Sequence, residues 1–322
     1  MTLDGKTVLV TGGTGSFGRK FTETVLRDYR PQKLIIFSRD ELKQHEMREV
    51  HPGSPMRYFI GDIRDRDRLH RAMQGVDIVI HTAALKQVPA CEYNPMEAVK
   101  TNVVGAQNVI DAAIDAGVQK VIAISTDKAV NPVNLYGATK LCAEKLFVQG
   151  NAYAGEGGTS LSCARYGNVV GSRGSVIPLF KSQMRNGHIT VTDERMTRFS
   201  ITLNQGVAFV LRCLEIMQRG ELFVPKIPSM RIMDLAKAMA PDCEIRFVGI
   251  RPGEKLHEVL ISKDEARSTV DLDDMFVIRP AHPMFQAPDW SCGKALPEGF
   301  EYTSDTNSQW LTGDALRKMA EE

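Results

Sequence analysis

The stretch KTVLVTGGTGSFG, residues 6–18, sets the fold class predicted for this chain. Its first five residues are an apolar run typical of a buried strand, and glycines follow at positions 12, 15 and 18. Helical periodicity resumes at Phe21. A strand, a glycine turn and a helix in this order indicate dinucleotide binding, because the glycines let the backbone approach a pyrophosphate and the helix N-terminus supplies amides to it. An ordinary tight turn would explain the glycines alone, but not their context.

The same alternation continues along the chain and predicts a parallel, doubly wound α/β sheet of the Rossmann type with right-handed crossovers. We expect a Rossmann domain over residues 1–168. Residues 169–322 are expected to form mainly a smaller C-terminal substrate-binding region, with some elements returning to the Rossmann core. A helix is predicted from Arg251 to about Leu260. The predicted strands of the first domain are 6–10, 33–37, 57–60, 77–81, 120–125 and 161–166.

Composition excludes several functional classes. The 322 residues are 43% hydrophobic and 25% charged, with a net charge of +1, which gives no general attraction to nucleic acid or anionic membranes. No apolar run reaches the ~18 residues of a membrane span. Met1–Gly5 leads directly into a strand, so we expect no signal peptide. Six scattered cysteines without a CxxC pair predict reduced thiols in the cytoplasm and no metal site.

The end of the second strand indicates the type of dinucleotide. Ser38 and Arg39 stand where an acidic residue would bind the ribose 2′-hydroxyl of NAD, and Lys43 follows one helical turn later. This pattern suits a 2′-phosphate and predicts NADP, although Arg39 could also be a solvated surface residue. Asp62 follows the third strand, where it could accept a hydrogen bond from the adenine amino group, cap the helix that begins at Arg64, or do both.

Small residues and a lysine follow the fourth strand, where the backbone could lie against the cofactor. The predicted cofactor contacts come from the glycine loop, the strand ends and one helix: Gly12, Thr14, Gly15, Ser16, Phe17, Gly18, Ser38, Arg39, Asp40, Lys43, Asp62, Ile63, Ala83, Ala84, Lys86, Tyr136, Lys140 and Val169.

Reactive side chains gather in KVIAISTDKAVNPVNLYGATK, residues 120–140. Thr126, Asp127 and Lys128 follow the fifth strand, and Tyr136 and Lys140 are four residues apart on one face of a predicted helix. Ligands bind at the carboxyl ends of strands in open α/β sheets, so we predict the reaction here. The alternatives are a strand-ending salt bridge for the Asp-Lys pair and helix-surface positions for the other two.

Two polar residues are expected to be structural. His81 lies in an apolar strand and is predicted to be a packed histidine rather than an acid or a base. Asn102 is predicted in a helix over residues 98–113 that faces the sheet, where its buried amide needs a partner.

Cations scattered through the second half could close over an anionic sugar nucleotide. Arg195 and Lys255 are two of them, and each could equally be surface charge. The predicted substrate contacts are Lys86, Asn168, Arg173, Val176, Ile177, Thr190, Arg198, Arg251 and Glu254.

The glycine motif together with Tyr136-x-x-x-Lys140 resembles the extended short-chain dehydrogenase/reductase family. Thr126-Asp127-Lys128 is similar to the motif of its UDP-N-acetylglucosamine 4,6-dehydratases, whereas dTDP-glucose dehydratases have Thr-Asp-Glu. The resemblance covers nearly the whole chain, through SRDELKQ, YFIGDIRD, CEYNP, RYGNVVGSRGSV, RMTRF, VPKIPSM and GIRPGEKLHEV. It implies the C5-inverting dehydratases that begin pseudaminic acid biosynthesis. Within that pattern the chain departs at Gln87 and Ser200, and its 185–192 loop is short.

The resemblance implies a role for each reactive group. Tyr136 would take the C4 hydroxyl proton while NADP accepts the hydride, and Thr126 would hydrogen-bond the reacting oxygen. Lys140 would lower the pKa of Tyr136 and hold the nicotinamide ribose. Lys128 would remove the C5 proton, which requires a lowered pKa that Lys140 and the oxidised nicotinamide would promote. Asp127 would protonate the departing C6 hydroxyl.

Alternative functions are a C5-retaining dehydratase, a UDP-sugar 4-epimerase, and a non-catalytic NADP-binding regulatory protein. An epimerase has no use for an Asp-Lys pair, and regulatory relatives usually lose the tyrosine or the lysine. The resemblance also implies a homo-oligomer, either a dimer or a hexamer.

Overall fold

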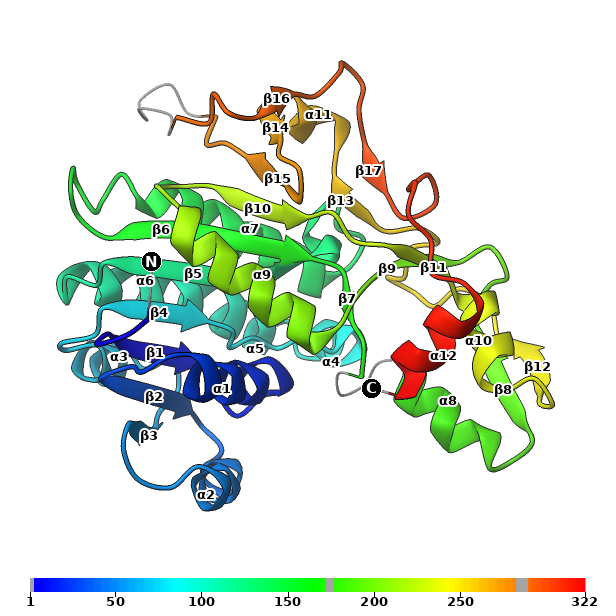
Figure 1. Ribbon diagram of the computed structural model, residues 1–322, viewed down its shortest axis with the longest axis horizontal. Helices are drawn as coiled ribbons and strands as arrows, with labels where there is room; N and C mark the ends of the chain where they lie inside the picture. Colours follow the sequence, from blue (N-terminus) through cyan, green and yellow to red (C-terminus); the bar gives the residue numbers. More distant parts are fainter. Residues whose placement is uncertain (1–2, 172–175, 282–288, 322) are drawn as a thin grey trace.

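The computed structural model describes residues 3–171, 176–281 and 289–321. A ten-stranded sheet runs through its centre in the order β16-β14-β15-β10-β6-β5-β4-β1-β2-β3 (Figure 1). The strands from β3 to β10 are parallel, and β15, β14 and β16 add an antiparallel edge. This sheet has the doubly wound Rossmann topology predicted from the alternation of strands and helices.

Six of the seven parallel strands are largely buried, as expected where both faces of a sheet are covered, whereas the edge strand β3 is partly exposed. Their bounds are β1 (Thr7–Thr11), β2 (Lys33–Ser38), β3 (Met56–Ile60), β4 (Ile78–His81), β5 (Lys120–Thr126), β6 (Ser160–Tyr166) and β10 (Leu222–Pro225). The antiparallel edge consists of β14 (Thr269–Asp271), β15 (Met275–Ile278) and β16 (Lys294–Ala295).

Helices cover both faces of this sheet (Figure 1). Helices α1 (Ser16–Asp28) and α9 (Leu203–Ile216) pack together on one face, and α3 (Arg66–Ala72), α6 (Gly105–Asp115) and α7 (Leu135–Gly150) pack on the other. The remaining helical segments around the sheet are α2 (Glu41–Val50), α4 (Val88–Tyr93), α5 (Pro95–Val99), the π-helical turn η1 (Lys100–Val104), the 3-10 turn η2 (Asp127–Ala129) and α11 (Lys263–Ala266).

A second, smaller hydrophobic core lies beyond the carboxyl ends of the parallel strands (Figure 1). We call this part the small lobe. It contains α8 (Val176–Met184), β8 (His188–Val191), α10 (Ile232–Met239), β12 (Glu244–Phe247) and α12 (Gly313–Glu321). Two short sheets lie between it and the main sheet: β7 (Asn168–Val169) with β9 (Thr197–Ile201) and β11 (Ser229–Arg231), and β13 (Val259–Ile261) with β17 (Tyr302–Thr303).

The helix predicted from Arg251 to Leu260 is wrong. Residues 251–258, which we call the strap, are irregular and lead into β13. Pro252 has no amide to donate, and Gly253 has φ +75°. Side chains from other segments donate to carbonyls of the strap in place of helical amides. Asn134 Nδ2 donates to the Gly253 carbonyl at 2.7 Å, and Arg198 Nη2 donates to that of Lys255 at 3.0 Å. Tertiary contacts therefore replace the helical hydrogen bonds.

The two predictions for structural polar residues are confirmed. His81 is buried, hydrogen-bonds Thr11 Oγ1 through Nδ1 at 2.8 Å and packs against the Phe147 ring. Asn102 is buried in η1, where its side chain bonds both the amide and the carbonyl of Leu85. No helix in the described part of the chain is long and apolar enough to cross a bilayer.

Candidate active site

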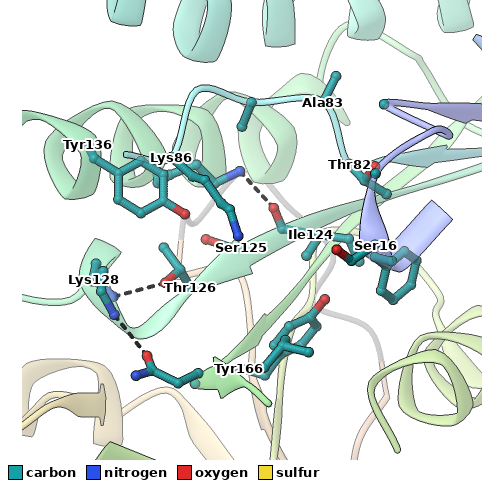
Figure 2. Close-up of a pocket in the computed structure, with 18 of the residues that line it drawn as sticks. Ser16, Thr82, Ala83, Lys86, Ile124, Ser125, Thr126, Lys128, Tyr136 and Tyr166 are labelled. Atoms are coloured by element: carbon teal, nitrogen blue, oxygen red, sulfur yellow. Dashed lines mark hydrogen bonds between the residues drawn. The ribbon is translucent and has the colours of Figure 1, made fainter. Parts of the chain in front are cut away.

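The reactive residues come together because β5 ends directly beneath the start of α7. Thr126 closes the strand, η2 carries Asp127 and Lys128, and Asn134 caps α7 by accepting from the Gly137 amide at 2.8 Å. A Cβ on Gly137 would lie 2.1 Å from the Lys128 carbonyl oxygen, so only glycine permits this approach. Tyr136 therefore faces the strand end and is not an exposed residue of the helix surface (Figure 2).

Asp127 and Lys128 form a hydrogen-bonded pair at this strand end. Asp127 is fully buried, and its Oδ1 accepts from Lys128 Nζ at 3.0 Å and from Thr126 Oγ1 at 2.9 Å. Its Oδ2 has no partner among the described residues. Lys128 Nζ also donates to Asn168 Oδ1 of β7 at 3.1 Å. The salt bridge between Asp127 and Lys128, considered as an alternative to a catalytic pair, is therefore present, and its Lys128 lines the cavity.

A second carboxylate, Glu258, reaches Lys128 from the strap. Its Oε1 lies 3.3 Å from Lys128 Nζ, and its side chain is 3% exposed. Sequence reasoning missed this residue. The only signal was its place in GIRPGEKLHEV, which was interpreted as part of a helix.

The lowered pKa predicted for Lys128 is wrong for this structure. Burial alone would lower the pKa of the amine, but the negative charges of Asp127 and Glu258 outweigh burial and raise it above its ordinary value. Sequence reasoning considered the nearby cations and missed the second carboxylate.

Tyr136 and Lys140 line the same cavity. Burial raises the pKa of Tyr136 to about 12, and the cation that opposes this rise is Lys128. Lys140 donates from Nζ to the Ile124 carbonyl at 2.7 Å, and burial lowers its pKa. In this arrangement Lys128, rather than Lys140, is the charge that favours the phenolate.

The cavity has a volume of about 490 Å³ and extends from the strand end to the glycine loop (Figure 2). Its predicted lining residues are Gly12, Gly15, Ser16, Phe17, Ala83, Ala84, Lys86, Thr126, Lys128, Tyr136, Lys140, Asn168 and Val169. Residues that the sequence analysis did not predict as ligand contacts also line it: Thr82, Gln87, Ile124, Ser125, Tyr166, Gly167 and Leu203.

The glycine end of this cavity fits a dinucleotide. Gly12 has φ +65°, and a Cβ there would lie 2.8 Å from the Ala83 amide nitrogen. Helix α1 begins without a side-chain cap, so its first amides point at the cavity mouth with the positive end of the helix dipole. The Ser125 hydroxyl is buried without a partner among the described residues and faces the same space. Gly18 has a different role, since it packs against Gly13.

The end of β2 brings together the residues predicted to select the dinucleotide. Thr14 Oγ1 and Ser38 Oγ are 2.8 Å apart and join the glycine loop to this strand. Asp40 caps α2 by accepting from the Lys43 amide at 3.0 Å, and it also pairs with the Lys43 ammonium. The carboxylate of Asp40, which follows the strand end where the ribose was predicted to bind, is therefore engaged with the first turn of α2.

Arg39 and Asp62 face each other across the same strand end. The Arg39 side chain is 53% exposed, with Nη1 3.4 Å from Asp62 Oδ2. Asp62 does not cap α3, which is the alternative its sequence position allowed, because Asp65 holds that position and accepts from the Arg68 amide. Asp62 instead pairs with Arg64 at 2.7 Å, and Ile63 beside it is buried in the core.

The predicted substrate contacts are distributed over three places. Asn168 and Lys86 line the cavity, whereas Val176, Ile177 and Thr190 belong to the small lobe. Arg173 lies outside the described residues. The strap carries the other predicted contacts, Arg251 and Glu254.

Arg198 is more buried than its predicted role implied. It is 5% exposed, and its Nη1 donates to the carbonyls of Thr197 and Leu256. Its Nη2 donates to the Lys255 carbonyl and lies 3.4 Å from Glu254. The guanidinium therefore fixes the strap in place.

The two departures from the family pattern also have structural positions. Gln87 lines the cavity and precedes α4 as its N-cap residue. Ser200 is buried, and its hydroxyl lies 3.1 Å from Met319 Sδ of α12. Gln87 can therefore contact a ligand directly, whereas Ser200 affects the packing of the small lobe.

Comparison with known proteins gives concordant matches. A family model described as polysaccharide biosynthesis protein matches residues 8–280. A Campylobacter jejuni protein named UDP-N-acetylglucosamine 4,6-dehydratase (inverting) is 54% identical over 322 residues, covering 97% of this chain and 96% of its own length. A Rickettsia conorii protein named UDP-glucose 4-epimerase is 46% identical over 283 residues, covering 85% and 82%. The X-ray structure of Pen from Bacillus thuringiensis superposes with a TM-score of 0.91 at 41% identity, covering 99% and 98%.

Proposed function

Because this chain belongs to the polysaccharide biosynthesis protein family, we propose that it is a UDP-N-acetylglucosamine 4,6-dehydratase that inverts the configuration at C5. The reaction removes water across C5 and C6 and yields UDP-2-acetamido-2,6-dideoxy-β-L-arabino-hex-4-ulose. Its place would be the first step of pseudaminic acid-type sugar biosynthesis. The enzyme class is hydro-lyase.

One observation supports this proposal above the others. Lys128 lines the same cavity as Tyr136 and Lys140, and its hydrogen-bonded partner Asp127 is buried beside it. A tyrosine and a lysine suffice for hydride chemistry at C4, whereas an elimination needs an additional base and an additional acid. A 4-epimerase would need no such pair, although several relatives bear that name.

NADP is the cofactor we propose, and when bound it supplies the hydride acceptor and donor. Its pyrophosphate would lie at the start of α1 against Gly12, Gly15 and the amides that follow. Exposed Arg39 would pair with the 2′-phosphate, since Asp40 is engaged in capping α2. Lys86 and Lys140 would contact the ribose and nicotinamide end of the cavity.

The C4 hydroxyl proton would go to Tyr136, whose phenolate Lys128 favours through its charge. Thr126 would hold the reacting oxygen. Oxidation at C4 makes the C5 proton acidic, because the carbanion formed is conjugated with the ketone. Lys128 would then remove that proton, and Asp127 would protonate the departing C6 hydroxyl. The C5–C6 double bond formed would take back the hydride at C6 and a proton at C5 from the opposite face, which gives the inverted 6-deoxy product.

The hydrogen bond between Lys128 and Asp127 provides a direct route for proton transfer between the two groups. Moving one proton across the 3.0 Å from Nζ to Oδ1 converts an ammonium and a carboxylate into an amine and a carboxylic acid. These are the base and the acid that the elimination requires. The resting ion pair therefore already contains the right number of protons.

The division of labour we propose follows the two cores. Residues 1–168 would bind NADP, and residues 169–322 would mainly bind UDP-N-acetylglucosamine through Arg251, Glu254 and the small lobe. Arg198 would act through the strap it fixes. We also propose a cytoplasmic homo-oligomer, a dimer or a hexamer.

The test is incubation of the purified protein with UDP-N-acetylglucosamine in deuterated water, followed by NMR of the product. The expected product has a 6-methyl group, deuterium at C5 and the L-arabino configuration. Retained D-configuration would indicate a retaining dehydratase, and a product that keeps its 6-hydroxyl would indicate an epimerase. Absence of turnover with dinucleotide bound would favour a regulatory protein and contradict the proposal.

A further inference from the structure

Glu258 is held in a fixed position although the strap around it is irregular. Its amide donates to Ser304 Oγ at 2.9 Å, and its carbonyl accepts from the Ser304 amide at 2.8 Å. Ser304 Oγ is also 2.7 Å from Thr197 Oγ1 of β9. The backbone of Glu258 is thus fixed on both sides, which sets the direction of its side chain.

The carboxylate of Glu258 is aimed at a cluster of cations. Oε1 lies 3.3 Å from Lys128 Nζ and 3.8 Å from Arg198 Nε. Oε2 lies 3.9 Å from Lys255 Nζ and has no hydrogen-bond partner among the described residues. A buried carboxylate oxygen without a hydrogen bond is costly, so its retention calls for an explanation beyond stability.

Charged and titratable groups face Lys128 from every element around it. They are Asp127 on η2, Glu258 and Lys255 on the strap, Arg198 on β9, Lys86 after β4 and Tyr136 on α7. Only the two carboxylates stabilise a positive charge on Nζ, and the three cations oppose it. Arg198 is itself balanced by Glu254 at 3.4 Å.

We propose that Glu258 is a positioning residue that acts through Lys128, holding Nζ beside Asp127 and stabilising the ammonium that forms when Lys128 removes the C5 proton. This inference rests on the proposed dehydratase function. In that step the C5–H bond breaks, its proton binds the Nζ lone pair, and the electron pair is delocalised onto the C4 ketone oxygen. A negative charge 3.3 Å away favours the ammonium product and makes the amine a stronger base.

The first test measures the charge state of Lys128 without turnover. Trace labelling with acetic anhydride, followed by peptide mass spectrometry, gives the rate at which the neutral amine of Lys128 reacts between pH 7 and 11. Its side chain is 25% exposed, which admits a small reagent. We expect Glu258→Gln to lower the pH of half-maximal labelling, because each unit of lowered pKa gives about tenfold more neutral amine.

Glu254→Gln is the matched control. It removes a carboxylate from the same strap that contacts Arg198 and not Lys128, so the labelling midpoint of Lys128 should stay at the wild-type value. Glu258→Asp keeps the negative charge but moves it farther from Lys128. The labelling midpoint of Lys128 in this variant should therefore fall between those of the wild type and Glu258→Gln. It also serves if the glutamine variant fails to fold. A Lys128 midpoint that is the same in the wild type and the Glu258 variants would overturn the inference.

The second test follows C5 chemistry in deuterated water. For Glu258→Gln we expect the low-pH limb of deuterium uptake at C5 to move to lower pH together with the labelling midpoint, because both follow the pKa of Lys128. A shifted labelling midpoint with an unmoved pH limb would also overturn the role in proton removal. If the wild type itself forms no 6-deoxy product, the proposed function fails, while the labelling experiment still decides whether Glu258 controls Lys128.

Discussion

Lys128 shows how strongly one side chain depends on its neighbours in this site. Asp127 beside it in the chain and Glu258 from the strap both lie within 3.3 Å of its Nζ. Together they make the resting residue an ammonium, although the chemistry proposed for it needs an amine. A short transfer to Asp127 supplies that amine, so the identity of the two partners is as important as the lysine itself.

Replacing Lys128 with alanine should abolish both product formation and deuterium uptake at C5, because no other group is placed to remove that proton. Loss of a general base lowers a rate by roughly 10²- to 10⁴-fold. Proton NMR in deuterated water measures both quantities. Bound dinucleotide is the control for folding, and a variant with normal turnover would show that the base is another residue.

Arg39 is the residue on which the choice between NADP and NAD should depend. We expect Arg39→Ala to weaken NADP binding by about tenfold or more while leaving NAD binding nearly unchanged, since a hydrogen-bonded charge pair contributes about 1.5–3 kcal/mol. Isothermal titration with each dinucleotide gives the ratio. An NADP-to-NAD ratio equal to that of the wild type would exclude a 2′-phosphate contact.

The contact between η2 and the first turn of α7 is the secondary-structure feature that builds the site. It brings Lys128 and Tyr136 into one cavity wall, and it depends on the missing side chain of Gly137. The strap reaches Lys128 through Glu258 and is tied to the start of α7 through Asn134. Neither segment has enough regular structure of its own to hold its position without the other.

Gly137→Ala should therefore damage the site, because its Cβ would lie 2.1 Å from the Lys128 carbonyl oxygen. We expect a loss of about 1–3 kcal/mol in the free energy of unfolding, typical of overpacking, together with loss of dehydratase activity. Gly206→Ala in α9 is the control, since its Cβ meets nothing within 4 Å. Urea denaturation should show that the control is as stable as the wild type or more so. Equal stability of both variants would refute the close approach.

The molecule as a whole combines one large sheet with a small lobe beyond the carboxyl ends of its parallel strands. The cavity lies between the carboxyl ends of the parallel strands and the glycine loop, and β7 and the start of α9 complete its lining. The sheet core beneath it contains His81 as a buried neutral group. That burial links the stability of the entire fold to pH.

Burial lowers the pKa of His81 to about 3, against an ordinary value of 6.5. Below pH 6.5 the unfolded chain binds a proton that the folded chain does not, so stability falls as the pH falls from 6.5 toward 3. The slope from one such group is about 1.4 kcal/mol per pH unit. His81→Gln should remove this contribution, and urea denaturation at pH 7, 6 and 5 should show a flatter dependence than the wild type. An unchanged slope would indicate that His81 does not remain neutral in the fold.

Local pattern was sufficient for the sheet and for most of the chemistry. The glycine spacing after β1, the alternation of strands and helices, and the Tyr136–Lys140 interval all depend on near neighbours in the chain, and such periodicities survive in the folded state. His81 and Asn102 were predicted as buried for the same reason. The irregular conformation of the strap was not predicted. Pro252 and Gly253 interrupt the helical pattern, and the hydrogen bonds that replace it come from Asn134 and Arg198.

The amino-acid sequence alone was enough to predict the doubly wound fold and to place Thr126, Asp127, Lys128, Tyr136 and Lys140, the reactive residues that we propose, together at one strand end. It did not predict the charge on Lys128. That charge depends on Glu258, 130 positions later in the chain, which folding brings to 3.3 Å from the amine. Coulombic interactions act through space and strengthen when water is excluded, so the protonation of a buried base is a property of the folded molecule.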